Sequence, residues 1–342
     1  MGQRKAKTAA LVDADSAMPK YRQIVENVLR GIESGALARG DALLSISALC
    51  RSRLVSRDTV VKAYNALEER GAIEARHGKG FYVATSRVDR RIKVFVMFDV
   101  LSNGFKERVY QGLLEAAGAG ADFDFYSHNF SEDVFCHTLE DARGQYEYYV
   151  VMPFLGSERV KKCLAQFDQE KLLLLDIDLD FPGKDCAIVR QDHDLELERV
   201  LETAAKRFSR YQRFELVFPE VVQNPPCIKD ACRRFCRRHG LPLAITKKLN
   251  PKTVAKGTAY LVIDDTDLVA LVKELHARGW EAGKDVGIIS YNDTPLKEIA
   301  EGGVTVVSVD FFAQGRKAGR QVLTRKKVEI LEPTQLILRK TL

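Results

Sequence analysis

The sequence predicts an α/β protein of two unlike parts, a small helical N-terminal domain with one hairpin and a larger domain of two lobes built on parallel sheets. Three observations support this prediction. The excess positive charge lies in the first 90 residues, and helical periodicity is followed there by a glycine-rich hairpin pattern. In the remaining chain, short apolar runs alternate with amphipathic helical patterns, as they do in doubly wound folds.

Length and composition limit the class of protein. The chain has 342 residues, of which 46% are hydrophobic and 29% charged, and this length suggests two or three globular domains. The longest apolar runs, such as 171–177 and 286–289, are far shorter than the roughly 20 residues that a membrane helix needs. The N-terminal residues lack the apolar core of a secretory signal. We therefore expect a cytoplasmic protein that does not enter a membrane.

The seven cysteines form no C-x-x-C pair. Their scattered spacing fits reduced thiols better than a disulfide framework or a zinc site. Cys232 and Cys236 lie one helical turn apart, and we interpret the Cys227, Cys232 and Cys236 group as packing residues. No metal site is expected.

The net charge of +6 arises entirely in the N-terminal part. Residues 1–90 contain 16 Lys and Arg against 10 Asp and Glu, whereas the rest of the chain contains 37 of each. Lysine and arginine supply the sequence-independent part of DNA affinity. A solvated basic face would produce the same imbalance. Charge alone therefore leaves both interpretations open.

The pattern within this basic segment favours DNA binding. Residues 1–17 are polar and unpatterned, and we expect a disordered arm there. Apolar residues from Tyr21 to Ile32 recur at helical spacing, and Ser45 can cap a second, short helix. In the third segment, residues 55–71, Ser56 is a suitable N-cap for a helix whose inward stripe is Val60, Ala63, Tyr64 and Leu67.

The third helix and the following hairpin carry the candidate DNA contacts. A recognition helix places base-reading and phosphate-binding side chains near its N-terminus in the major groove. Residues 73–83 contain two β-prone runs around a glycine-rich tip, which permits a tight turn. The predicted contacts are Ser56, Arg57, Asp58, Thr59, Lys62, His77, Gly78 and Lys79. Three helices and a basic hairpin predict a winged helix-turn-helix over residues 18–86, and the polar residues 87–91 are interpreted as a linker.

Four separated motifs keep one order and spacing: PKYRQI (19–24), SGALARGD (34–41), SRDTVVKAYNALEERGAIE (56–74) and RHGKGFYV (76–83). Together they resemble the GntR family of bacterial regulators. The resemblance implies that the start of the recognition helix and the wing tip contact an operator, at Ser56, Arg57, Thr59, His77, Gly78 and Lys79. Leu44 and Ser47 stand where many family members have a proline and an arginine.

The remaining residues, 92–342, alternate strands with helices. Strands are predicted at 93–98, 122–127, 148–152, 172–176, 187–190, 214–218, 259–263, 286–290 and 304–308, and helices at 105–117, 134–144, 157–167, 195–208, 227–239, 267–278 and 314–323. This number of strands fits two doubly wound lobes better than one. Ligands of such sheets bind at the carboxyl ends of the strands, and two facing lobes make that edge a cleft.

Polar and aromatic residues recur at these strand ends. Carboxylates and amides can accept hydrogen bonds from vicinal hydroxyls, and aromatic faces pack on ring C–H groups, so the pattern predicts a polyhydroxylated ligand. Asp and Asn also cap the helices that follow strands, so the recurrence supports the prediction more than any one residue does. The candidates are Asp99, Asn103, Phe105, His128, Phe154, Asp176, Asp192, Glu220, Asp264, Tyr291, Asn292 and Asp310.

The segment GKDVGIISYNDTPLKEIAEGGVTVVSVDFFAQGRKAG (283–319), supported by LLLLDID (172–178), VRQD (189–192) and AYLVIDDTDLVALVKELHARG (259–279), resembles the sugar-sensing domain of the LacI/GalR type. That domain shares its fold with periplasmic sugar-binding proteins. The resemblance implies effector contacts at Asp192, Arg233, Asn292 and Asp310, with Asp264 on the hinge side. A GntR-like domain joined to a LacI-like sensor is the arrangement of the arabinose repressor and similar sugar regulators.

The two resemblances together imply a ligand-responsive transcriptional regulator, in particular a repressor of carbohydrate-utilisation genes. We expect a homodimer on a palindromic operator, released by a sugar or sugar derivative that binds between the lobes. A non-sugar metabolite is the alternative effector. The choice among sugars stays open, because many would accept the same acids and amides.

Other classes of function find little support. Phosphate-loop and dinucleotide fingerprints, G-x-S-x-G and H-E-x-x-H are all absent. We therefore expect neither an enzyme nor a bound cofactor. A sugar-transport protein is disfavoured because an export signal is missing and a DNA-binding segment is present.

Overall fold

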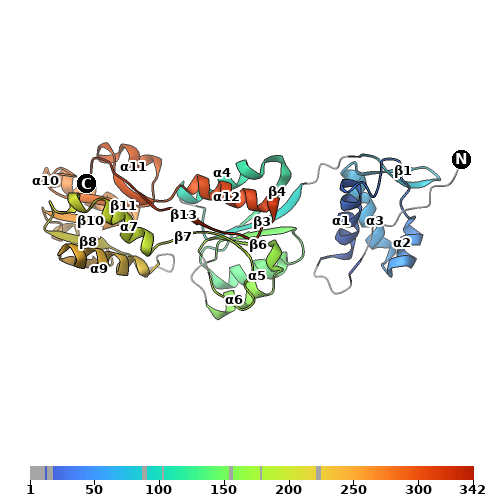
Figure 1. The fold of residues 1–342 in the computed structure, drawn as a ribbon, viewed down its shortest axis with the longest axis horizontal. Coiled ribbons are helices and arrows are strands. Elements are labelled where there is room, and N and C mark those ends of the chain that lie inside the picture. Colours follow the sequence, from blue (N-terminus) through green and yellow to red (C-terminus); the bar gives the residue numbers. More distant parts are fainter. Residues whose placement is uncertain are drawn as a thin grey trace. The chain divides into compact units, whose positions relative to one another are not determined.

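The computed structural model describes residues 12–13, 18–86, 91–101, 104–153, 157–177, 179–220 and 225–342, with Arg53 described in its main chain only (Figure 1). Two candidate effector residues, Asn103 and Phe154, lie outside these ranges, as do most of the predicted arm and residues 87–90 of the predicted linker. Asp13 of the predicted arm is described, and its main-chain N–H donates a hydrogen bond to Gln23 Oε1 at 2.7 Å.

The N-terminal domain consists of three helices and one hairpin. Its elements are α1 (Lys20–Glu33), α2 (Ile46–Arg53), α3 (Arg57–Glu69), β1 (Ile73–Arg76) and β2 (Gly80–Val83), and the two strands pair antiparallel. The predicted caps are confirmed, because the hydroxyls of Ser45 and Ser56 accept hydrogen bonds from the N–H groups of Ala48 and Thr59. The winged helix-turn-helix architecture is confirmed.

The core of this domain holds α3 in place. The predicted stripe of α3 is buried, and it packs in one cluster with Ile24, Val28 and Leu29 of α1. The Tyr64 hydroxyl donates to the carbonyl oxygen of Leu44 at 2.7 Å, and the Phe81 ring of β2 meets the Tyr64 ring edge-on. Burial raises the pKa of Tyr64 to about 12. The wing and the second helix are therefore both fixed to α3.

The larger domain contains two lobes with largely parallel sheets, as predicted, and each sheet has six strands, whereas the sequence predicted nine strands in all. Lobe 1 has the strand order β13-β7-β6-β5-β3-β4. Its strands are β3 (Ile92–Phe98), β4 (Ala121–Ser127), β5 (Tyr148–Val151), β6 (Leu172–Asp176), β7 (Ala187–Gln191) and β13 (Glu329–Glu332), and its helices are α4 (Gly104–Ala117), α5 (Glu132–Ala142), α6 (Glu158–Ala165) and α12 (Phe311–Thr324). The strand pairs with a defined register are parallel.

Lobe 2 has the strand order β14-β12-β11-β10-β8-β9, parallel except that β14 runs antiparallel to β12. Its strands are β8 (Arg213–Val217), β9 (Leu243–Thr246), β10 (Thr258–Val262), β11 (Gly287–Tyr291), β12 (Thr305–Ser308) and β14 (Gln335–Ile337), and its helices are α7 (Leu195–Thr203), α8 (Ala205–Phe208), α9 (Cys227–His239), α10 (Asp265–Arg278) and α11 (Pro295–Ile299). Cys232 and Cys236 are free thiols buried in its core, as their interpretation as packing residues expects.

The chain passes between the lobes three times. The crossings lie between β7 and α7, between β12 and α12, and between β13 and β14. The second crossing returns the chain to lobe 1, where α12 packs along α4 (Figure 1). A methyl group at Gly315 would lie 2.0 Å from the carbonyl oxygen of Val109, so only glycine allows the two helices to approach this closely.

Candidate functional site

The first turn of α3 is one candidate surface. Ser56 Oγ accepts from the Thr59 N–H at 3.2 Å and lies 2.7 Å from Thr59 Oγ1, so these two hydroxyls organise the turn. Arg57 and Asp58 are exposed. The Arg57 guanidinium forms no ion pair with any described side chain and is available to a partner. Lys62 is also exposed, and its ammonium stacks over the Tyr21 ring at 4.3 Å.

The wing tip is the second candidate surface. His77, Gly78 and Lys79 are exposed, and Gly78 has a left-handed φ of 67° that suits the turn. The Lys79 N–H donates to the Arg76 carbonyl oxygen at 2.8 Å, and the Tyr82 hydroxyl donates to the Lys79 carbonyl oxygen at 3.2 Å. The main chain of the tip is thus held in place while the Lys79 ammonium remains open.

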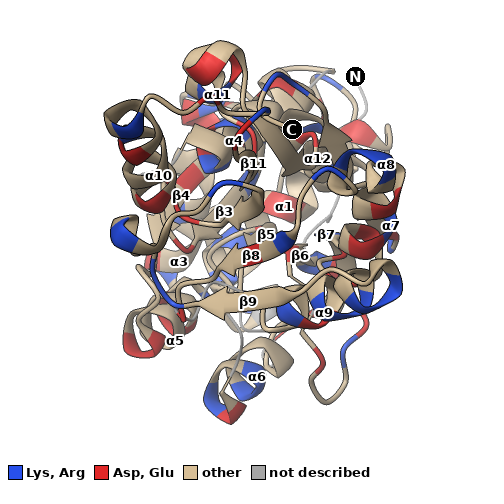
Figure 2. Cartoon of the chain, turned by 90° about the vertical axis from the view of Figure 1, so that its left-hand side faces the viewer, with Lys and Arg blue, Asp and Glu red and all other residues tan. Residues whose placement is uncertain are grey.

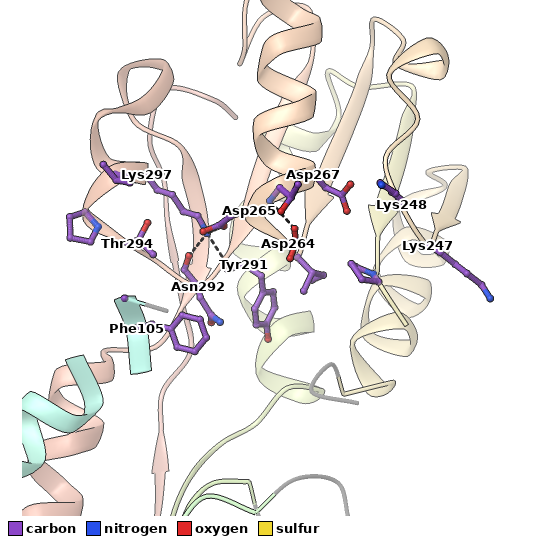
Figure 3. A pocket seen from close by; sticks show the side chains of 16 residues that line it. Phe105, Lys247, Lys248, Asp264, Asp265, Asp267, Tyr291, Asn292, Thr294 and Lys297 are labelled. Carbon is purple, nitrogen blue, oxygen red and sulfur yellow. Dashed lines mark hydrogen bonds and ion pairs between the residues drawn. The ribbon is translucent and has the colours of Figure 1, made fainter. Parts of the chain in front are cut away.

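A cleft of about 830 Å³ lies between the two lobes of the larger domain (Figure 3). Lobe 1 contributes Gly104 and Phe105. Lobe 2 contributes residues that follow the carboxyl ends of β8, β9, β10 and β11 and residues at the starts of α10 and α11: Pro219, Lys247, Lys248, Ile263, Asp264, Asp265, Thr266, Asp267, Tyr291, Asn292, Thr294, Pro295, Leu296 and Lys297. Four of the predicted effector residues, Phe105, Asp264, Tyr291 and Asn292, line it.

The end of β11 presents an amide and a phenol to this cleft. Asn292 has a φ of 62°, a left-handed conformation that asparagine tolerates better than most residues. Its side-chain oxygen is buried and has no hydrogen-bond partner among the described residues. The Tyr291 hydroxyl lies 3.2 Å from Nδ1 of His193, which belongs to the first crossing, and burial raises the pKa of Tyr291. A buried amide oxygen without a hydrogen bond is unfavourable unless a ligand or water donates one.

Lys297 fixes this strand end. Its side chain is buried, and the ammonium donates to the carbonyl oxygens of Tyr291 at 3.0 Å and Asn292 at 2.8 Å. The same ammonium pairs with Asp265 at 2.7 Å (Figure 3). Sequence reasoning missed Lys297 because its five-residue helix was not predicted.

The cleft also contains the carboxylate of Asp264 and the ammonium groups of Lys247 and Lys248. Asp264 Oδ1 caps α10 through the Thr266 N–H at 2.7 Å, which leaves the other carboxylate oxygen open. Lys247 pairs with Glu220 at 2.6 Å. Lys248 is exposed in the cleft and forms no ion pair with a described side chain. Both lysines follow β9, a strand that was not predicted.

Lobe 1 holds a buried charged cluster. The Lys106 ammonium lies 2.7 Å from Asp176 and 3.3 Å from Asp99, and Gln191 donates to Asp176 at 2.6 Å. Burial opposes the charged forms, but the two carboxylates raise the pKa of Lys106, and Lys106 lowers the pKa of Asp176. The two predicted carboxylates therefore satisfy a buried cation. Neither of them lines the cleft.

Comparisons with known proteins agree with both parts of this geometry. Residues 20–83 match the family described as bacterial regulatory proteins, gntR family, and residues 184–342 match the periplasmic binding protein-like domain. The mannosyl-D-glycerate transport/metabolism system repressor MngR of Escherichia coli (strain K12) is 41% identical over 81 residues, which are 24% of this chain and 34% of MngR. The chain is a transcriptional regulator that joins a GntR-type winged helix-turn-helix to a periplasmic-binding-protein-like effector domain.

Solved structures show the same fold for the effector domain of the regulator. The trehalose repressor from Escherichia coli superposes with a TM-score of 0.61 at 21% identity, covering 73% of this chain and all of that one. A LacI family regulator from Lactobacillus casei with bound glucose superposes with a TM-score of 0.59 at 15% identity, covering 73% and 99%. At these identities the likeness shows the fold alone. The N-terminal match is to a family of regulatory proteins and the C-terminal match is to a binding-protein-like domain, so the matched families are not those of enzymes.

The regulator places its other predicted effector residues outside the cleft lining. His128 is buried, and its Nε2 lies 3.1 Å from the Met152 carbonyl oxygen. Asp192 accepts from two N–H groups at the start of α7, Glu220 bridges Lys229 and Lys247, and Arg233 is exposed and paired with Asp230.

Two features explain these positions. Arg233 belongs to the strongly basic helix α9 (Figure 2), whose arginines pair with acids along the helix and on α7. Asp310 caps α12 through the Ala313 N–H at 2.9 Å and lines a separate hollow of about 240 Å³ beside Arg108 and Asp293. For Asp192 and Asp310, helix capping accounts for the aspartate after a strand.

The described residues contain no helix with the length and apolar character needed to cross a bilayer. Within the same residues, no group of three or more His, Cys, Asp or Glu side chains is arranged to hold a metal ion.

Proposed function

We propose that this regulator represses carbohydrate-utilisation genes by binding a palindromic operator as a homodimer, and that a sugar or sugar derivative in the interlobe cleft releases it. The observation that carries the effector part is the buried amide oxygen of Asn292, which lacks a partner at the wall of an 830 Å³ cleft. A ligand hydroxyl can donate the hydrogen bond that this oxygen needs.

The neighbouring groups complete a site for a polyhydroxylated ring. Asp264 offers an open carboxylate oxygen, and Phe105 of lobe 1 offers an aromatic ring beside Asn292 of lobe 2 (Figure 3). Pockets for small ligands combine apolar surfaces with a few placed polar groups in this way. Lys248 adds an unpaired cation at the β9 side of the cleft, which favours sugar phosphates and sugar acids within this class.

The comparisons support the same class of ligand. One solved relative of the effector domain binds glucose and another is named a trehalose repressor, while MngR is named for a mannosyl-glycerate system. The cleft residues of this chain supply carboxylate, amide and aromatic groups of the kind that sugar recognition requires.

Release from DNA would follow from closure of the lobes. The three crossings are the segments that join them, and His193 of the first crossing bonds to Tyr291 at the cleft wall. A ligand that contacts Phe105 on one lobe and Asn292 on the other binds the closed form better than the open form. The shift it produces is limited by this difference in affinity.

On the DNA side, we propose residues 18–86 as the DNA-binding domain and residues 92–342 as the effector and dimerisation domain. Arg57 at the start of α3 would read a base edge, and Lys62 and Lys79 would bind phosphates. Two observations support the assignment of DNA contacts to the N-terminal domain: the guanidinium of Arg57 is exposed and unpaired, and Lys79 is exposed at the wing tip.

A gel-shift titration tests the proposed regulation. The full chain is mixed with the DNA upstream of its own operon, with and without a panel of neutral sugars, sugar phosphates and sugar acids. We expect a sequence-specific complex that one member of the panel dissociates. Non-sugar metabolites form the control panel, and release by one of these alone would refute a sugar effector.

Separate substitutions of Arg57 and Lys79 test the proposed DNA contacts. Arg57→Ala should relax specificity at one base pair of each half-site, so that the free-energy preference for the correct base there falls by roughly 1–3 kcal/mol. Lys79→Glu should weaken binding to operator and random DNA alike and reduce the salt dependence. Equal losses on operator and random DNA for Arg57→Ala would contradict the assigned role of Arg57.

A further inference from the structure

The turn between α2 and α3 contains an unusual leucine. Leu54 ends α2 with φ 52° and ψ 44°, in the left-handed region. Leu54 is 89% exposed, more than any other large apolar residue that the structure describes. An exposed apolar side chain and a strained backbone therefore coincide at one residue.

The fold of the N-terminal domain gives no reason for a leucine at this position. The left-handed conformation is unfavourable for residues with a Cβ, and helices that end in it usually have glycine there. The next residue, Val55, is 7% exposed and supplies the apolar group that the turn adds to the core. Glycine at position 54 would relieve the backbone strain and leave the core unchanged.

The location of Leu54 indicates what its side chain can contact. It lies two residues before the N-cap Ser56 and three before Arg57, at the end of the recognition helix that enters the major groove in this class of domain. Exposed arginines stand on either side in sequence, at Arg51 and Arg57. An apolar protein partner would have to bury these charges, whereas DNA phosphates attract them.

We infer that Leu54 is a specificity-determining residue of the regulator, whose side chain packs against a thymine 5-methyl group in the major groove. The methyl group is the one apolar feature of that groove, and apolar side chains read it by contact. This inference rests on the proposed function, because it requires the start of α3 to face the operator.

The test uses an operator duplex selected by the wild-type full chain from a random-sequence DNA pool. Each thymine is then replaced in turn by deoxyuracil, which removes only the methyl group. We expect one thymine in each half-site at which the replacement weakens wild-type binding about fourfold, the effect of one methyl group. In Leu54→Gly the same replacement should have no effect.

The Leu54→Gly substitution separates DNA contact from folding. Because the substitution removes the backbone strain of a leucine in the left-handed region, we expect the thermal midpoint of the N-terminal domain in the full chain to rise by a few degrees. Operator affinity should fall, while affinity for random DNA should stay within about twofold of the wild-type value. Leu54→Asn, which tolerates the same backbone, should match the loss of operator affinity. Arg325→Gly, a left-handed helix end in the effector domain, is the control and should leave DNA binding unchanged.

Two results would overturn the inference. One is a deoxyuracil profile that is the same for the wild type and for Leu54→Gly. The other is operator affinity that Leu54→Gly leaves unchanged. If no sequence is enriched from the random pool, the proposed operator binding fails and the role of Leu54 fails with it, whereas enrichment without a Leu54-dependent thymine leaves the proposed function standing.

Discussion

The two lobes of the effector domain both carry carboxylates near their strand ends, but they use them differently. In lobe 1, Asp99 and Asp176 converge on the buried ammonium of Lys106. In lobe 2, Asp264 caps a helix with one oxygen and turns the other toward the cleft, beside the unpaired amide oxygen of Asn292. A strand-end carboxylate is therefore available to a ligand only where no buried cation already satisfies it.

The difference has an energetic basis. The Lys106 side chain is 5% exposed, and those of both aspartates are 12% exposed, so the cluster has little access to water. Removing charges from water is unfavourable unless each charge finds partners, and here Met152 and Gln191 supply additional contacts. The charged cluster of lobe 1 is thus internally paired, while lobe 2 keeps an unpaired amide oxygen for a ligand.

The largest effect is expected from removing Lys106. Lys106→Met leaves two buried carboxylates without their cation and should lower the free energy of unfolding by roughly 3–5 kcal/mol. Urea unfolding of the full chain measures this loss of unfolding free energy. The triple variant Lys106→Met, Asp99→Asn, Asp176→Asn should recover most of the loss, and Lys161→Met, which removes an exposed pair with Glu158, should show no measurable loss. A Lys106→Met protein as stable as the wild type would mean that the cluster is not a stabilising unit.

A pH dependence follows from the same cluster. The pKa of Asp176 is lowered from its usual 3.8 by Lys106, so its contribution to stability is complete above about pH 3.8 and is lost as the pH falls through the lower pKa of the folded state. The pKa of Lys106 is raised from 10.5, so its contribution is complete below that value and is lost at higher pH.

The measurement is the difference in unfolding free energy between the wild type and Asp176→Asn, taken from urea titrations at pH 7, 4 and 3. The difference should be constant from pH 7 to 4 and should shrink by pH 3. A difference that grows as the solution becomes more acidic would show that Asp176 is not ionised in the folded protein.

The smallest effect on folding is expected in lobe 2. Asn292→Gly keeps the left-handed backbone and removes the amide, so stability should change by less than about 1 kcal/mol. Affinity for a sugar found by thermal-shift screening should fall about three- to tenfold, the effect of one neutral hydrogen bond. Asn292→Asp, which restores an acceptor, is the matched control and should recover part of the affinity. Unchanged affinity in Asn292→Gly would place the ligand away from this wall.

The sequence predicted the lobes well where periodicity was strong. The helix at 227–239 and the strand at 172–176 agree with the structure to the residue. The missing elements are short or atypical. Strand β9 has four half-buried residues, β13 begins and ends in glutamate, and α11 has only five residues. The predicted helix at 195–208 is interrupted at Ala204.

The candidate site was harder to predict because pairing between distant residues leaves no local pattern. Asp176 ends an apolar strand and Asp264 follows one, and nothing near either one in sequence shows that Lys106, 70 residues before Asp176, neutralises Asp176. Lys248 and Lys297 were missed because their elements were missed. The surface of the N-terminal domain was easier, because its caps, turns and exposed faces depend on residues close in sequence.

The three crossings also bear on the order in which the protein forms during synthesis. Lobe 1 is discontinuous, since α12 and the edge strand β13 come from residues 311–332, after most of lobe 2. Until these residues leave the ribosome, the face of α4 that includes Gly112 and the outer edge of β7 have no partner. The N-terminal domain closes its core within residues 18–86 and can fold first. We expect nascent chains that end near residue 308 to contain a protease-resistant N-terminal domain and an unfinished lobe 1.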